Sequence, residues 1–336
     1  MQTDTARFEG LVERLVGLAF KEAAPEIKTL VGHRFPDDDA WLCLWMAKNF
    51  IAKTKKAQVV FVNAGEILPG TDSDPTVIHF DTGGREYDQH GKSLKNTSSS
   101  HLLAKGLGLD DPGLEPLLEL AKAVDNIERL PATSVHFIIE GYPRRLEFQK
   151  SGGIIDWQKI QERVFELFDI IYGQETQRVQ NRKALREHAE WTTLPNGIKI
   201  ASLFWHPELR EAAFEQGAAV VVWTQFRRKD RFYVGIQRHR DYPSLQLNKV
   251  AEMIRFREGK VRNIDVMGKN LQYIGRGEPV KNWFLHDSLG LILSGSRSWK
   301  LEPEEYTNLA PQDIAGIVHR ALGNIPREVV SQWKKQ

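Results

Sequence analysis

A short stretch near the start of the chain gathers side chains that are suited to binding a metal ion. Between Gly32 and Ala40 it holds one histidine, His33, and a run of aspartates from Asp37 to Asp39. Crowded carboxylates repel one another unless a cation lies between them. A neutral imidazole together with carboxylate oxygens suits Mn²⁺ or a similar divalent ion. Because Asp also caps helices well, an acidic helix N-terminus is the alternative interpretation.

The elements around this stretch place it where a strand ends. The apolar run 27–31 predicts a short buried strand, and the run 41–47 predicts a buried helix. Residues 76–81 predict another strand, which ends in Asp81. Side chains at the carboxyl ends of strands converge on ligands in α/β sheets. If the two strands are neighbours, His33 and Asp81 reach the same crevice.

Other polar residues of the first half also follow predicted strands or helices. They are Asp39, Asp88, His90 and Asp125. Taken singly, Asp125 is equally consistent with a helix-end residue, and His90 with a loop histidine. A carboxylate shared by two divalent ions ~3.5–4 Å apart is an arrangement that activates water and holds a phosphoryl group.

The order of elements predicts an α/β protein with two domains. A chain of 336 residues is long for one core. Short strands alternate with helices in residues 1–150, which predicts an N-terminal domain with a mainly parallel sheet flanked by helices. We expect a helical connector at 151–194 and a smaller C-terminal α/β domain with a mixed sheet at 195–336. A further helix is predicted at 7–22. Residues 133–148 are consistent with either a strand or a helix, and Gly141-Tyr142-Pro143 is expected to break this segment.

The composition is that of a globular protein, with 41% hydrophobic and 27% charged residues. The formal net charge of +2 neither requires nor excludes a nucleic-acid partner. The single cysteine, Cys43, lies in the apolar helix and is expected in the core. The N-terminus lacks the apolar region of a signal peptide, and no apolar run approaches a membrane span, so we expect a cytoplasmic protein.

The motifs resemble those of the DHH phosphoesterase superfamily, which includes RecJ-type exonucleases, oligoribonucleases and family II inorganic pyrophosphatases. The segment 33–40 resembles its first motif. The segments 81–84 and 87–90 resemble the Asp-x-Gly-Gly and Tyr-Asp-His-His motifs of the MYG branch, named after melanocyte proliferating gene. Further segments follow in the order of the same branch: Ser98-Ser99, Val124-Asp125-Asn126, 284–290 and 294–296. The similarity is specific in the first 130 residues and loose after 195.

This resemblance implies a site with two divalent ions, Mn²⁺ or Mg²⁺. His33, Asp37 and Asp81 would hold one ion tightly. Asp39, Asp81 and Asp125, with a histidine of the DHH motif, would hold the second. The C-terminal domain would close over the cleft and supply cations to the substrate phosphate. The residues expected to contact the substrate are Arg34, His286, Ser296, Arg297 and Lys300.

The chain departs from the family pattern at Gln89, which stands where the first histidine of the pair is usual. An amide offers only a neutral oxygen, so the second ion is expected to bind more weakly. Asp88, Gln89 and His90 are the expected catalytic residues. Neighbouring residues of an extended segment point to opposite sides. His90 would therefore replace the missing ligand only in a distorted turn, and would otherwise face the substrate phosphate.

Two functions from different classes follow. The first is a divalent-metal-dependent phosphoesterase, acting on nucleic-acid ends, short oligonucleotides or nucleotides in the cleft between the domains. The second is a catalytically weakened relative that binds nucleic acid or a nucleotide. A basic cluster around Arg227 and Arg228 is interleaved with aromatic residues, as suits single-stranded nucleic acid. The alternative is that these rings belong to the core and the charges solubilise a hairpin.

Overall fold

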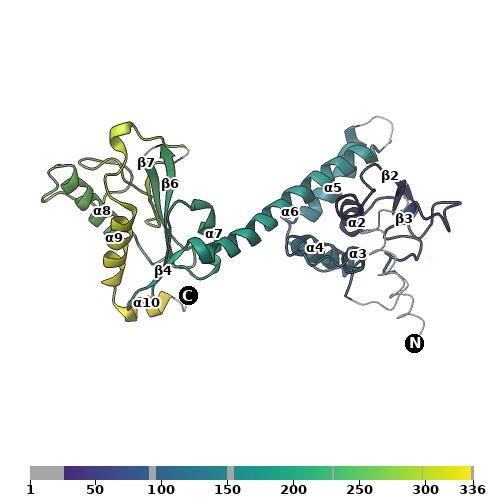
Figure 1. The fold of residues 1–336 in the computed structure, drawn as a ribbon, viewed down its shortest axis with the longest axis horizontal. Helices are drawn as coiled ribbons and strands as arrows, with labels where there is room; N and C mark the ends of the chain where they lie inside the picture. The colour runs from purple at the N-terminus through teal and green to yellow at the C-terminus, as the bar shows by residue number, and fades with distance from the viewer. Residues whose placement is uncertain (1–25, 91–95, 150–154, 229–230, 297, 334–336) are drawn as a thin grey trace. The chain divides into compact units, whose positions relative to one another are not determined.

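The computed structural model describes residues 26–90, 96–149, 155–228, 231–296 and 298–333 (Figure 1). The predicted helix at 7–22 lies outside these residues. The chain divides into two compact units, residues 1–177 and 178–336, and each is described by itself. No helix in the described ranges is long and apolar enough to cross a membrane.

The first unit is built on a three-stranded parallel sheet with the order β2-β1-β3. The strands are β1 (Thr29–His33), β2 (Gln58–Val62) and β3 (Val77–His79). Val31 of β1 pairs with Val60 on one side and His79 on the other. The predicted strands and their parallel pairing are confirmed. Because the strands are parallel, their carboxyl ends meet at one edge of the sheet.

A helix that is buried almost all round follows β1. This helix, α2 (Asp38–Phe50), buries Trp41 and Trp45 in the core of the first unit, with Cys43 between them. It packs against α3 (Ser99–Gly106) and α4 (Glu115–Asp125). The apolar composition of α2 matches this enclosed position.

The expected break at Gly141-Tyr142-Pro143 is wrong. Residues 135–149 form one helix, α5 (Val135–Gln149), with Pro143 inside it. Proline removes one backbone donor and disfavours a helix interior. Ile139 is fully buried in the core, and Val135 and Tyr142 pack against the same core. Tertiary packing therefore outweighs the local preference.

The helix α6 (Trp157–His188) has 32 residues and covers most of the predicted connector. It begins in the first unit and ends in the second. Ile160, Val164 and Phe168 are buried in the core of the first unit. Leu185, near the other end, is buried in a core of the second unit.

The second unit contains a six-stranded mixed sheet with the order β4-β5-β6-β7-β9-β8. Its strands are β4 (Glu190–Thr193), β5 (Lys199–Leu203), β6 (Val220–Arg228), β7 (Arg231–Arg238), β8 (Phe284–Leu285) and β9 (Leu291–Ser294). Only β5 and β6 pair in parallel among these described strands. The expected α/β class, with a mixed C-terminal sheet, is confirmed.

Alternating residues of β6 belong to separate apolar clusters. Val220 and Val222 lie in one cluster, and Val221 and Trp223 in the other. This is the two-residue period of a strand whose two faces are both covered. The helices of this unit are α7 (Arg210–Glu215), α8 (Asn248–Val261), α9 (Pro311–Gly323) and α10 (Arg327–Trp333). Short 3-10 turns lie at Pro207–Leu209 and Pro303–Glu305.

Candidate metal centre

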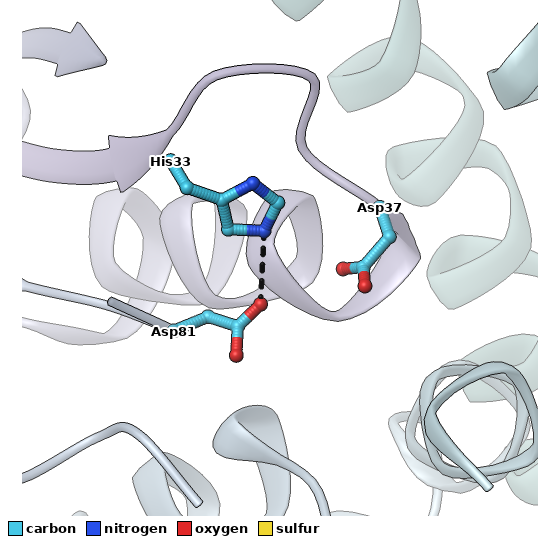
Figure 2. Close-up of side chains that lie close together, drawn as sticks. All are labelled: His33, Asp37 and Asp81. Carbon is cyan, nitrogen blue, oxygen red and sulfur yellow. Dashed lines mark hydrogen bonds and ion pairs between the residues drawn. The ribbon is translucent and has the colours of Figure 1, made fainter. Parts of the chain in front are cut away.

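Three side chains meet at the carboxyl edge of the parallel sheet. His33 ends β1, Asp37 precedes α2, and Asp81 follows β3 (Figure 2). The His33 Nε2 atom lies 3.1 Å from Asp81 Oδ2. One ligand atom from each of the three residues lies within 4.8 Å of the others. The structure therefore brings together His33, Asp37 and Asp81.

The local backbone explains where Asp37 and Asp81 point. Asp37 is the N-cap of α2 and accepts a hydrogen bond from the Ala40 backbone N–H at 3.0 Å. Asp81 has a φ of 52°, in the left-handed region that residues other than glycine seldom occupy. Gly83 follows with a φ of 72°, and a Cβ atom there would lie 2.4 Å from Ile67 Cγ2. Strained backbone of this kind persists where the surrounding structure holds it, and it is common at functional sites.

The hydrogen bonds of His33 fix its ring nitrogens. Its Nδ1 donates to the Arg34 carbonyl oxygen at 3.0 Å, so Nδ1 carries a proton. Burial alone would lower the pKa of His33. Hydrogen bonds to Asp81 and Arg34, and the charges of Asp37 and Asp81, reverse that effect and raise the pKa to about 9. Release of the Nε2 proton leaves a lone pair aimed at the group, with the ring held by Nδ1 as in metal-binding histidines.

Burial and mutual repulsion raise the pKa values of the neighbouring carboxyl groups. Burial, then the charge of Asp81, raises the pKa of Asp37. Burial, with the charges of Asp81 and Asp37, raises the pKa of Asp39 to about 7. Burial and the charges of Asp39, Asp37 and Asp81 raise the pKa of Asp125 to about 8. A bound cation would relieve this mutual repulsion.

Asp39 lies in the first turn of α2 and accepts hydrogen bonds from the first turn of another helix, α3. Its Oδ2 accepts from the Ser99 backbone N–H at 2.6 Å, and its Oδ1 accepts from the Ser100 backbone N–H at 2.9 Å. Both groups belong to the N-terminus of α3, which favours a negative charge. Among the described residues, Asp39 belongs to neither group of side chains that could hold an ion.

Gln89 is buried, and both polar atoms of its side chain have hydrogen-bond partners. Its Nε2 donates to Asp125 Oδ2 at 2.8 Å and lies 3.2 Å from His90 Nε2. Its Oε1 accepts a short hydrogen bond from the Ser99 hydroxyl. Asp125, like Asp39, stands outside both groups of candidate ligands found among the described residues.

Of the two alternatives for His90, the structure has the distorted turn, because the side-chain nitrogens of Gln89 and His90 are in contact rather than on opposite sides. The turn is held by Asp88, which accepts from the backbone N–H groups of Gly84 at 2.7 Å and His90 at 2.9 Å. The exposed His90 ring lies 3.4 Å from Asp81 Oδ1. Asp81, Asp88 and His90 form a second group of possible ligands.

The expected substrate-contacting residues belong to different units. Arg34 is exposed directly after β1, beside the metal group. His286, Ser296 and Lys300 belong to the second unit. There His286 Nδ1 lies 2.6 Å from Asp287 Oδ1, and the Ser296 hydroxyl accepts from the Trp299 backbone N–H at 3.0 Å. Arg297 lies outside the described residues.

Two features near the site were not assigned from the sequence. The Ser99 Oγ atom, whose hydrogen goes to Gln89, also lies 3.3 Å from Asp81 Oδ1, so Ser99 contacts three of the site residues. The sequence pattern of the serine run indicates only a helix cap and a family motif. His136 Nδ1 lies 2.5 Å from Asp38 Oδ2, although the two residues are 98 positions apart. No spacing signal in the sequence identifies that pair.

No family model matches the chain, and no curated protein sequence matches it. A solved structure that matches it is described as a DHH domain and as a member of a family of ribosomal proteins. It has 11% sequence identity and a TM-score of 0.30, and the alignment covers 96% of this chain and 98% of that chain. At this level of similarity, the functional inference depends on the residues of the site itself.

Proposed function

We propose that the chain is a divalent-metal-dependent phosphoester hydrolase of the DHH type, closest to the MYG branch. The observation that carries the proposal is the convergence of His33, Asp37 and Asp81 where parallel strands end. These are the residues whose order and spacing resemble the first and second motifs of that superfamily. Asp81 lies more than forty residues after His33 and Asp37, so the sequence motif around His33 does not by itself bring the three side chains together.

The donor set fits Mn²⁺ or Mg²⁺. It offers one imidazole nitrogen and carboxylate oxygens, which bind hard or borderline divalent ions rather than soft ones. Asp37 and Asp81 raise the pKa of His33 by their negative charges. A divalent ion placed among the three side chains would compensate the same charges.

When bound, the ion supplies Lewis acidity, which lowers the pKa of a water molecule and polarises a phosphoryl oxygen. The protein groups position the reactants. Arg34 is exposed beside the group, where it would neutralise a substrate phosphate. His90 lies on the other oxygen of Asp81, exposed, and would hold or transfer a proton at Nε2.

A nucleic-acid substrate is supported by the hairpin of the second unit. Phe226 is 61% exposed and Trp205 is 47% exposed, with ring centroids 6.4 Å apart. The Arg227 guanidinium lies 4.3 Å from the ring centre of Tyr233. Exposed rings beside arginines suit single-stranded nucleic acid, because bases stack and phosphates pair. Trp223 and Tyr233 are buried, so part of the aromatic cluster is core, as the alternative interpretation held.

The second candidate is a relative that binds nucleic acid or a nucleotide without turnover. Gln89 favours it, because this residue replaces a metal-binding histidine and is fully engaged in hydrogen bonds. The retained His33, Asp37 and Asp81 group favours the enzyme.

Hydrolysis of a short, end-labelled single-stranded oligonucleotide in Mn²⁺ tests the two candidates. Asp81→Asn is the negative control, and Asp241→Asn, a substitution at an exposed carboxylate of the second unit, is the matched control. Turnover that is lost only in Asp81→Asn supports the enzyme. Oligonucleotide binding without turnover supports the second candidate, and the absence of both contradicts the proposal.

A further inference from the structure

We infer that this chain binds a single divalent ion, because Gln89 fills the position of a second ion with hydrogen bonds. The inference rests on the proposed function and refines it, since the sequence suggested a second, weaker ion. The relevant groups are the side chains that the family pattern would give to that ion.

The Gln89 amide has no unused polar atom for a metal. One N–H faces Asp125 Oδ2 at 2.8 Å, and the other faces His90 Nε2, which is 3.2 Å away. The carbonyl oxygen accepts from the Ser99 hydroxyl. The residue is 7% exposed, so water does not compete freely for these bonds.

The amide also presents the wrong polarity for an ion. An N–H group has a partial positive charge, and it points at the carboxylate that would otherwise bind the cation. A second ion next to Asp125 would have to displace this N–H group. That displacement would break the contacts of Gln89 with Asp125, His90 and Ser99 together.

Asp39, another carboxylate of the expected second set, is also engaged. Both oxygens of Asp39 accept backbone N–H groups, from Ser99 at 2.6 Å and from Ser100 at 2.9 Å. Ser99 therefore holds Asp39 through its N–H group and Gln89 through its hydroxyl group. Hydrogen bonds therefore connect Asp39 through Ser99 and Gln89 to the Oδ2 atom of Asp125.

The group formed by Asp81, Asp88 and His90 does not replace the lost site. Asp88 uses one oxygen for the Gly84 N–H and the other for the His90 N–H. These bonds shape the turn that carries Gln89. Recruiting Asp88 to an ion would disturb the same turn.

The test counts Mn²⁺ ions on the full-length protein by calorimetric titration. Low-temperature EPR then shows whether two Mn²⁺ ions are close enough to couple. Gln89→Glu keeps the shape but replaces the N–H donor with a carboxylate beside Asp125, and a cation between them would compensate both charges. Gln89→His restores an imidazole. Gln58→His, at the exposed start of β2, is the matched control.

We expect one ion in the wild-type protein and in Gln58→His, and two coupled ions in Gln89→Glu and Gln89→His. Two ions in the wild-type protein would overturn this inference and leave the proposed function standing. No ion in the wild-type protein would overturn the proposed function instead. One ion in both folded Gln89 variants would show that Gln89 is not what excludes the second ion. Circular dichroism identifies any variant that fails to fold. The wild-type count decides by itself whether one ion binds, and the folded Gln89 variants decide whether Gln89 is the cause.

Discussion

The Asp81 carboxylate lies between two histidines, with Oδ2 3.1 Å from His33 Nε2 and Oδ1 3.4 Å from His90 Nε2. One histidine ends β1, and the other is the exposed residue that ends the largely buried turn after the glycine pair. Asp81 therefore connects the half-buried metal group to the exposed His90 ring. Its left-handed backbone makes this placement depend on the surrounding structure.

Asp81→Asn should remove divalent-metal binding while the fold persists. Asn tolerates the left-handed backbone, so the change removes charge with little added strain. Loss of an indirect partner of a metal ligand typically costs 10–100-fold in affinity, so loss of a ligand should cost at least about 100-fold. Calorimetric titration with Mn²⁺ measures the effect. An affinity close to that of the wild-type protein would remove Asp81 from the ligand set.

Asp39→Ala should reduce stability more than metal affinity. The change removes the carboxylate that accepts two N–H groups of the first turn of α3, whose N-cap is Ser98, and loss of such an acceptor costs about 0.5–2 kcal/mol. Asp37→Ala is the contrasting variant, because Asp37 caps α2 and also lies in the metal group. Denaturant unfolding and Mn²⁺ titration of both variants separate the two roles. If Asp39→Ala loses Mn²⁺ affinity as Asp37→Ala does, Asp39 is a ligand after all.

Without divalent ions, the stability of the protein should fall as the pH rises from about 4 to 9. The folded-state pKa values of Asp39 and Asp125, about 7 and about 8, lie above the ordinary value of 3.8. The folded state therefore binds more protons within that window, and stability decreases with pH. The pKa of His33 is raised from 6.5 to about 9, so its contribution is present below 6.5 and is lost through 9.

Thermal unfolding in a chelator at several pH values checks this prediction. The stabilisation given by added Mn²⁺ should grow with pH, because the ligands must lose protons before they bind. Stability of the ion-free protein that increases toward alkaline pH would show that these carboxyl groups are not strained as described.

Phe226→Ala should weaken binding of single-stranded nucleic acid by about 1–3 kcal/mol if one base stacks on this ring. Phe256→Ala, in α8, removes another partly exposed ring and serves as the control. Fluorescence anisotropy with a labelled oligonucleotide gives both affinities. Equal losses in the two variants, or none in Phe226→Ala, would argue that the hairpin does not bind bases.

Much of the fold was predictable because its core elements have clear apolar patterns. The run 27–31 and the run 41–47 are apolar and bounded by polar residues, and they appear in β1 and α2. β4 was missed because it is a short, half-exposed strand at the edge of its sheet. The break expected at Pro143 was wrong because the local preference of proline does not include the packing of Ile139 in the core.

The first metal group was predictable because His33 and Asp81 each follow an apolar strand. The role of Asp39 was not, because its partners lie 60 and 61 residues further along the chain. The contact between Gln89 and His90 depends on a turn shaped by Asp88, which strand periodicity does not describe. Both depend on tertiary structure rather than on spacing.

Anomalous diffraction from crystals soaked in Mn²⁺ tests the proposed metal centre most directly. We predict one strong peak bounded by His33 Nε2 and the carboxylates of Asp37 and Asp81, and none in crystals of Asp81→Asn. A wild-type crystal with no peak among these three side chains, at Mn²⁺ concentrations that saturate the protein in solution, would contradict the proposal.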